Sequence, residues 1–257
     1  IFRILSLNND LTGEEPDFVN SALAISQTGH PRFYQAEQIP NQLALWHPPM
    51  YIYSLALIAR FSTGEVALRS LNFIFSILTA LIIFLFCLRI NKEKGKQIGL
   101  LAVALFLVNY YVLSSSILID IDVLSMFFTF SFFYLIFSYY KTKKISYAIL
   151  ASLAFLFSLS NRYPIAIITF ILVWFYFLIK KETRKFARNY FGIGLIGGLI
   201  FLAIWTFYST IIEPGTFFSF IEHNAQLGIM QFSSISLYFF SFCLNISQII
   251  RLFTLPT

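Results

Sequence analysis

Residues 66 to 96 read VALRSLNFIFSILTALIIFLFCLRI followed by NKEKGK, a largely apolar run of 25 residues that ends in a cluster of lysines. A helix needs about 20 consecutive apolar residues to cross the hydrocarbon core of a bilayer. The run is therefore long enough to span a membrane, and the lysines mark a polar loop at its end. This pattern predicts a transmembrane helix over residues 66 to 90.

The same pattern recurs along the chain, so we expect seven spans. The other six runs are residues 98 to 119, 123 to 140, 145 to 160, 164 to 179, 191 to 211 and 236 to 253. The composition agrees, because 58% of the residues are hydrophobic and only 12% are charged, which excludes a soluble domain. We predict an all-α, polytopic transmembrane helical bundle over residues 66 to 257, preceded by an external segment with short helices over residues 1 to 65.

Basic residues orient the predicted bundle, because lysine and arginine are retained on the cytoplasmic side during insertion. They gather in alternate breaks between the runs: Arg89, Lys92, Lys94 and Lys96, then Lys141, Lys143 and Lys144, then Lys180, Lys181, Arg184, Lys185 and Arg188, and finally Arg251. Most acids fall on the other side. The net charge of +6 is thus explained by membrane orientation and indicates no nucleic-acid partner. We expect a multi-pass protein of the plasma membrane whose active site faces the extracytoplasmic side.

Neither the cysteines nor the chain ends suggest further chemistry. Cys87 and Cys243 both lie within apolar runs, which supports neither a disulfide nor a metal cluster. The sequence begins at Ile1 without a methionine and ends soon after an apolar run, so we interpret it as a fragment truncated at both ends.

A short helix is predicted in the external segment, where residues 12 to 30 read TGEEPDFVNSALAISQTGH. Proline suits the first turn of a helix, Phe18, Ala22 and Ile25 share an apolar face, and Gly29 is a typical stop. Glu14 and Glu15 stand at its beginning. Carboxylates there can simply complement the helix dipole, or they can serve a function.

A second external helix is predicted within LWHPPMYIYSLALIARF, residues 45 to 61. The double proline prevents a helix before Met50, and the apolar segment that follows is too short to span comfortably. Its tyrosines are typical of a helix lying at the headgroup level of the membrane. His47 is either a polar residue at the helix entry, a ligand of a lipid phosphate or part of a metal site.

Two later interruptions place charges at the external ends of spans. Asp120 and Asp122 interrupt ILIDIDVLSMFF, residues 117 to 128, and ionisable groups at such depth usually have a partner or a function. Arg162 lies in SLSNRYPIAI, residues 158 to 167, just before a proline-led span. Its guanidinium can pair with an acid or clamp a phosphate, and the sequence does not separate the two.

In their order and spacing, these motifs resemble the membrane glycosyltransferases that use lipid-phosphate sugars. This superfamily includes bacterial relatives of protein O-mannosyltransferases and the aminoarabinose transferases of lipid A. The resemblance covers roughly residues 10 to 180: an acidic pair opening a short external helix, a basic or histidine residue before proline, a second-loop aspartate, and a basic residue before a proline-led span. It implies the C-type glycosyltransferase fold.

The resemblance also implies roles for individual residues. Glu14 matches the catalytic base, which is usually aspartate in the family, and Glu15 matches the second acid; which of the two reaches the acceptor stays open. Asp122 matches the second-loop aspartate, and His47 and Arg162 match the residues near the donor phosphate. The further polar residues that we assign to the surroundings of the site are Asp17, Asp120, Glu222 and His223.

The reaction implied is inverting transfer of a sugar from a polyprenyl- or dolichyl-phosphate donor to an acceptor hydroxyl. The acceptor is a lipid, a glycan or a protein. No cofactor is required, although a divalent metal held by Glu222 and His223 with Glu14 or His47 is an alternative.

Two other functions fit the same residues. In a secondary transporter or lipid flippase, Asp120, Asp122 and Arg162 would line the path, although their place at the ends of spans argues against this. A membrane scaffold that keeps the fold without activity is the third reading, and glutamate in place of the expected aspartate is its main support.

Overall fold

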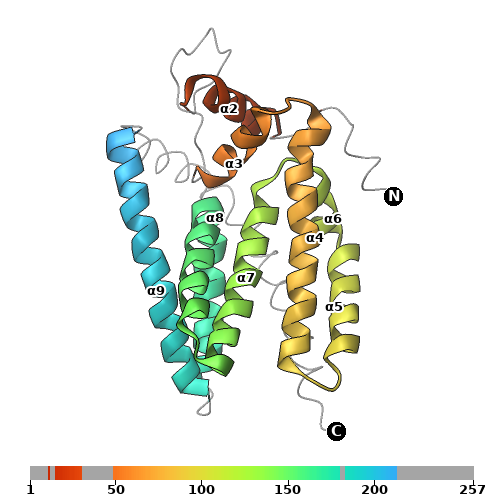
Figure 1. The fold of residues 1–257 in the computed structure, drawn as a ribbon, viewed down its shortest axis with the longest axis vertical. Coiled ribbons are helices and arrows are strands. Elements are labelled where there is room, and N and C mark those ends of the chain that lie inside the picture. The colour runs from red at the N-terminus through yellow and green to blue at the C-terminus, as the bar shows by residue number, and fades with distance from the viewer. Residues whose placement is uncertain (1–10, 12–14, 31–48, 180–182, 213–257) are drawn as a thin grey trace, which may run out of the picture.

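The computed structural model describes residue 11 and residues 15–30, 49–179 and 183–212, and the regular structure in these ranges is helical throughout. The elements are α2 (Glu15–Thr28), α3 (Met50–Ala59), α4 (Glu65–Ile90), α5 (Gly95–Val108), α6 (Tyr110–Ile117), α7 (Ile121–Thr142), α8 (Ile145–Ile179), α9 (Arg184–Phe207) and the π-helical turn η3 (Tyr208–Ile212). Figure 1 shows α4, α5, α7, α8 and α9 side by side as a bundle, with α2 and α3 across one end.

The two short helices across the end of the bundle, α2 and α3, lie where the sequence predicts short helices before the first span. The apolar face of α2, which contains Phe18, Ala22 and Ile25, is buried. The helix ends before Gly29, whose φ of +81° lies in the left-handed region that favours glycine. α3 begins directly after Pro49, because proline lacks the N–H that a helix interior needs.

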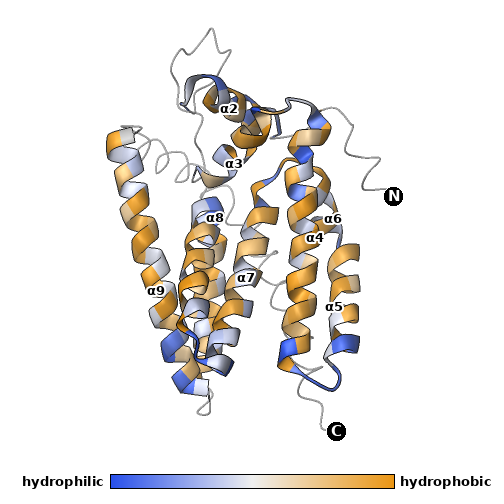
Figure 2. Cartoon of the chain, viewed as in Figure 1, coloured by the Kyte–Doolittle hydropathy of each residue, from blue (hydrophilic) through white to orange (hydrophobic). Residues whose placement is uncertain are grey.

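The bundle helices have the length and hydropathy of membrane spans, which confirms the multi-pass all-α fold. Four helices qualify individually, namely α4, α7, α8 and α9 with its π-helical extension, and the bent pair α5 and α6 qualifies together. Hydrophobic residues run along these helices and hydrophilic residues collect near their ends (Figure 2). The predicted span over residues 236 to 253 lies outside the described residues.

The predicted span over residues 98 to 119 is bent in the structure, because its helix is broken at Asn109. The two parts, α5 and α6, meet at an angle of 65°. Asn109 has an extended backbone, and its side-chain oxygen accepts hydrogen bonds from the N–H groups of Tyr111 and Val112. An asparagine that caps the following turn in this way starts a new helix instead of continuing the old one.

The predicted spans over residues 145 to 160 and 164 to 179 form the two arms of α8. The helix is interrupted at Arg162, whose φ of −144° and ψ of 79° are not helical. The ring centroids of Phe155 and Phe170 lie 4.8 Å apart, whereas these positions would be about 22 Å apart in a straight helix. The chain therefore turns back on itself at Arg162, and Pro164 starts the second arm.

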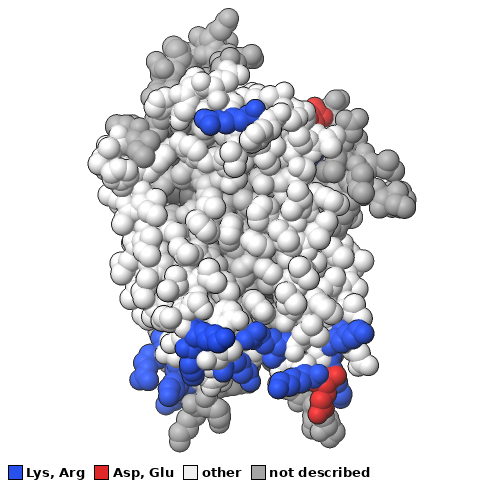
Figure 3. All heavy atoms as spheres, viewed as in Figure 1, with Lys and Arg blue, Asp and Glu red and all other residues white. Residues whose placement is uncertain are grey.

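Charge divides the bundle into two ends. Most of the lysine and arginine side chains visible in Figure 3 gather at the end away from α2 and α3. The connections from α4 to α5 and from α7 to α8 lie at this basic end, as the alternation of lysines predicts. The end covered by α2 and α3 consequently holds the charged residues considered next.

Candidate functional site

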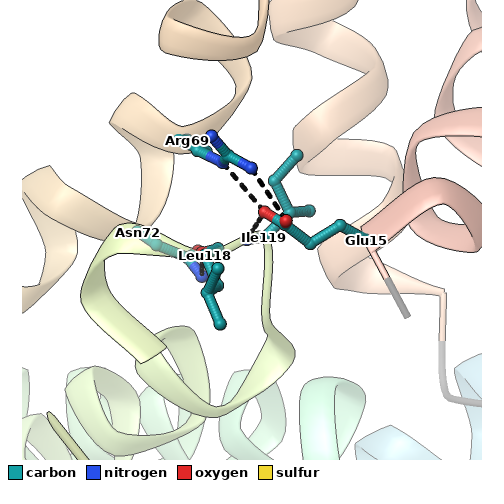
Figure 4. Close-up of polar contacts among 5 residues, drawn as sticks. All are labelled: Glu15, Arg69, Asn72, Leu118 and Ile119. Atoms are coloured by element: carbon teal, nitrogen blue, oxygen red, sulfur yellow. Dashed lines mark hydrogen bonds and ion pairs between the residues drawn. The ribbon is translucent and has the colours of Figure 1, made fainter. Parts of the chain in front are cut away.

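A buried ion pair joins α2 to α4 of the bundle. The Glu15 carboxylate accepts hydrogen bonds from Arg69 Nε (2.9 Å) and Nη2 (2.8 Å), one at each oxygen. The side chains are only 2% and 1% exposed. The Ile119 N–H also donates to Glu15 Oε1 at 2.8 Å, so both carboxylate oxygens have close partners (Figure 4). This arrangement holds the charge of Glu15 in place.

Arg69 is not among the residues that the sequence pattern predicts for the site. It lies inside the apolar run assigned to the first span, where a single arginine is easily overlooked among 25 residues. In the structure it lies one turn into α4, at the end of the bundle that α2 covers. A lone arginine near the end of a predicted span, in a chain whose preceding segment carries several acids, is the signal that would have found it.

Asn72, one turn further along α4, holds the segment between α6 and α7. Its Nδ2 donates to the backbone carbonyls of Leu118 (2.7 Å) and Asp120 (2.6 Å), and also reaches the carbonyl of Ser115 at 3.2 Å. Its Oδ1 accepts a hydrogen bond from the Tyr51 hydroxyl at 3.2 Å. Asn72 therefore ties α3 and the segment over residues 118 to 120 to α4.

Asp120 and Asp122 take different positions at the start of α7. Asp120 is the N-cap, and its Oδ1 accepts a hydrogen bond from the Asp122 N–H at 3.1 Å. The buried Asp122 carboxylate accepts a charge-assisted hydrogen bond from Arg162 Nη1, at the point where α8 turns back. The Arg162 side chain keeps 32% of its surface exposed. Arg162 thus binds an acid of the chain while part of its side chain stays exposed.

α3 packs against this end of the bundle through buried side chains. Tyr51 is fully buried, with its ring edge-to-face against Phe18 at 5.5 Å. Burial, together with the negative charge of Asp120, raises the pKa of the Tyr51 hydroxyl well above its usual value, so the group stays protonated and donates to Asn72. The Tyr53 hydroxyl meets that of Tyr208 in η3 at 3.2 Å, which links α3 to the end of α9.

Of the residues predicted for the site, the structure brings Glu15, Asp120, Asp122 and Arg162 to the same end of the bundle. Asp17 lies in the first turn of α2, partly buried. Glu14, His47, Glu222 and His223 lie outside the described residues. Within the described ranges, no three His, Cys, Asp or Glu side chains gather as they would around a metal ion.

Comparison with known proteins adds one match. The family model described as dolichyl-phosphate-mannose-protein mannosyltransferase matches residues 46–208, which is more than half of the chain and includes α3, α4, the two aspartates and Arg162. No curated protein and no solved structure gives a significant match.

Proposed function

Because the chain belongs to the dolichyl-phosphate-mannose-protein mannosyltransferase family, we propose that it transfers a sugar from a polyprenyl- or dolichyl-phosphate donor to an acceptor hydroxyl. The observation that supports this most directly is Arg162, which is partly exposed where α8 turns back and is held there by the buried Asp122. Arginine presents several N–H donors in a planar fork that matches phosphate oxygens. A guanidinium fixed at the headgroup level of the membrane suits the phosphate of a lipid-linked sugar.

The catalytic base in this proposal is Glu14. Both oxygens of Glu15 already accept hydrogen bonds from Arg69, and one accepts a further bond from Ile119, so this carboxylate is a poor proton acceptor. The preceding residue in the sequence carries the other acid of the pair. Glu14 takes the proton of the acceptor hydroxyl, and Glu15 anchors the segment that carries Glu14.

The proposed step is a single displacement. The acceptor oxygen attacks the anomeric carbon and loses its proton to Glu14, while the bond from that carbon to the phosphate oxygen breaks. The phosphate leaves with the electron pair, and Arg162, with His47, stabilises its negative charge. Attack opposite to the leaving group inverts the anomeric configuration. The basic end of the bundle marks the cytoplasmic side, so transfer takes place on the outer face of the membrane.

The test is transfer of radiolabelled mannose from polyprenyl-phosphate mannose, and from a small panel of other lipid-phosphate sugars, in membranes that contain the chain. Glu14→Gln removes the base and should lower the rate about 100- to 10,000-fold at unchanged expression. Arg162→Gln removes the phosphate partner and should lower it about 100- to 1,000-fold. The matched controls are Glu65→Gln and Arg60→Gln. Glu65 lies at the start of α4 and Arg60 at the end of α3, so both residues lie at the end of the bundle that holds the candidate site.

The controls should retain transfer close to that of the parent. If Glu14→Gln and the parent transfer equally, the assignment of the base is wrong. If no donor in the panel supports transfer by the parent, the transporter and the inactive scaffold become the better explanations.

A further inference from the structure

Segment 118–120, which connects α6 to α7, and the first turn of α7 that follows it contact both ion pairs of the site. Ile119 donates its N–H to Glu15, which is held by Arg69. Three residues later, in the first turn of α7, Asp122 holds Arg162. The position of this short segment therefore fixes the distance between the acidic start of α2 and the guanidinium at the turn of α8.

The segment is held by α4 through one side chain. Asn72 Nδ2 contacts the carbonyls of Leu118 at 2.7 Å and Asp120 at 2.6 Å, on either side of Ile119. Asn72 is 0% exposed, and Figure 4 shows it beside Leu118, below the Glu15 and Arg69 pair. Leu118 and Asp120 are partly buried, and a carbonyl that loses both water and its donor costs about 1 to 3 kcal/mol. Asn72 thus supplies the hydrogen-bond donor for both carbonyls and holds the segment against α4.

We propose that Asn72 is a positioning residue of the reaction: by holding segment 118–120, it sets where Asp122 and Arg162 lie relative to Glu15 at the start of α2. This inference rests on the proposed function, since it assigns the phosphate to Arg162. In this proposal Asn72 contacts neither the sugar donor nor the acceptor hydroxyl, and it acts through the Asp122 and Arg162 pair. Tyr51, which donates to Asn72 Oδ1, fixes the orientation of the amide so that Nδ2 faces the segment.

The chemistry of the amide is essential to this role. Only a donor suits a site formed by carbonyl oxygens, so neither leucine nor aspartate of similar size can replace asparagine. Misplacing a catalytic group by about 1 Å can lower a rate by about 100-fold. Asn72→Leu should consequently lower kcat/KM by about this factor in the molecules that are folded.

A double-mutant cycle with Asn72→Leu and Arg162→Gln tests the proposal in the full chain. The cycle is measured both in kcat/KM for polyprenyl-phosphate mannose, per folded molecule, and in thermal unfolding of the detergent-solubilised protein. The matched control is Thr79→Val, because Thr79 is equally buried on α4 and its hydroxyl donates only to the Phe75 carbonyl of the same helix.

If Asn72 acts through Arg162, Asn72→Leu lowers kcat/KM about 100-fold in the parent and has little further effect in Arg162→Gln. The two substitutions are also non-additive in unfolding temperature, and Thr79→Val is additive with Arg162→Gln in both measurements. Tyr51→Phe, which removes only the hydroxyl bonded to Asn72, gives a smaller decrease in the same direction. Full additivity of Asn72→Leu and Arg162→Gln in both measurements would overturn the proposal.

The two readouts separate this inference from the proposed function. If the parent shows no transfer, the proposed function fails, and the unfolding cycle alone decides whether Asn72 positions the Asp122 and Arg162 pair. If the parent is active and Asn72→Leu retains its kcat/KM, the inference fails while the proposed function stands.

Discussion

Glu15 and Arg69 are both almost completely buried, and a buried charge is tolerated only beside a partner. Their two parallel hydrogen bonds, supported by the N–H of Ile119, satisfy this condition. The pair connects positions that are 54 residues apart in the sequence. At the scale of single residues, the pair attaches the start of α2 to α4.

Breaking this pair from one side should be costly. Arg69→Met keeps much of the side-chain volume but leaves the Glu15 carboxylate buried without its cation. We expect a loss of about 3 to 5 kcal/mol in the free energy of unfolding, measured by denaturant unfolding of the solubilised protein.

The double variant Glu15→Leu with Arg69→Met provides the control, because it removes both charges together. Replacing a buried pair by apolar residues is often nearly neutral, so most of the lost stability should return. The Ile119 N–H loses its acceptor in this variant and limits the recovery. A single variant as stable as the parent would show that the pair does not fasten α2 to α4.

At the scale of helices, the sequence predicted the elements well because hydropathy is a local property. The apolar runs fixed α4, α7, the arms of α8 and α9 to within a few residues, except that α9 begins earlier than predicted, at Arg184. The break at Asn109 was missed, since a single asparagine in an apolar run does not reveal that its side chain caps the next turn. The sequence left open whether Arg162 pairs with an acid or a phosphate and did not give the pairing of Arg69 with Glu15, because both pairings depend on how distant helices pack.

Close packing between α8 and α9 depends on glycine. A Cβ at Gly197 would lie 2.5 Å from the Ser152 carbonyl oxygen, which is backbone and cannot move aside easily. Gly197→Ala should therefore separate the helices and lower the unfolding free energy by about 1 to 3 kcal/mol. Thermal unfolding in detergent measures this change.

Gly198→Ala is the matched control for Gly197→Ala, since a Cβ at the next position of α9 meets no atom within 4 Å. Alanine is also the better helix former, so this variant should be as stable as the parent or slightly more stable. Equal effects of the two substitutions would mean that helix propensity, and not the contact with α8, governs stability here.

For the whole molecule, the separation of charge predicts the orientation in the membrane. The end with α2 and α3 carries the candidate site, and the opposite end carries most of the basic residues seen in Figure 3. Lysines and arginines in short loops are retained in the cytoplasm during insertion. The site should therefore face outward, where nucleotide sugars are absent and a lipid-linked donor is needed.

Single cysteines at the two ends test this orientation. Cys87 and Cys243 are first replaced by alanine, and then Thr63→Cys, in the exposed connection between α3 and α4, is compared with Lys94→Cys, in the exposed connection between α4 and α5. A membrane-impermeant maleimide added to intact cells should label the cysteine at position 63 and not the one at position 94, which should react only after permeabilisation. The reverse pattern would place Arg162 and Glu15 on the cytoplasmic face and would contradict transfer on the outer face. Labelling of both positions in intact cells would indicate a mixed orientation, which contradicts the orientation expected from the basic residues at one end.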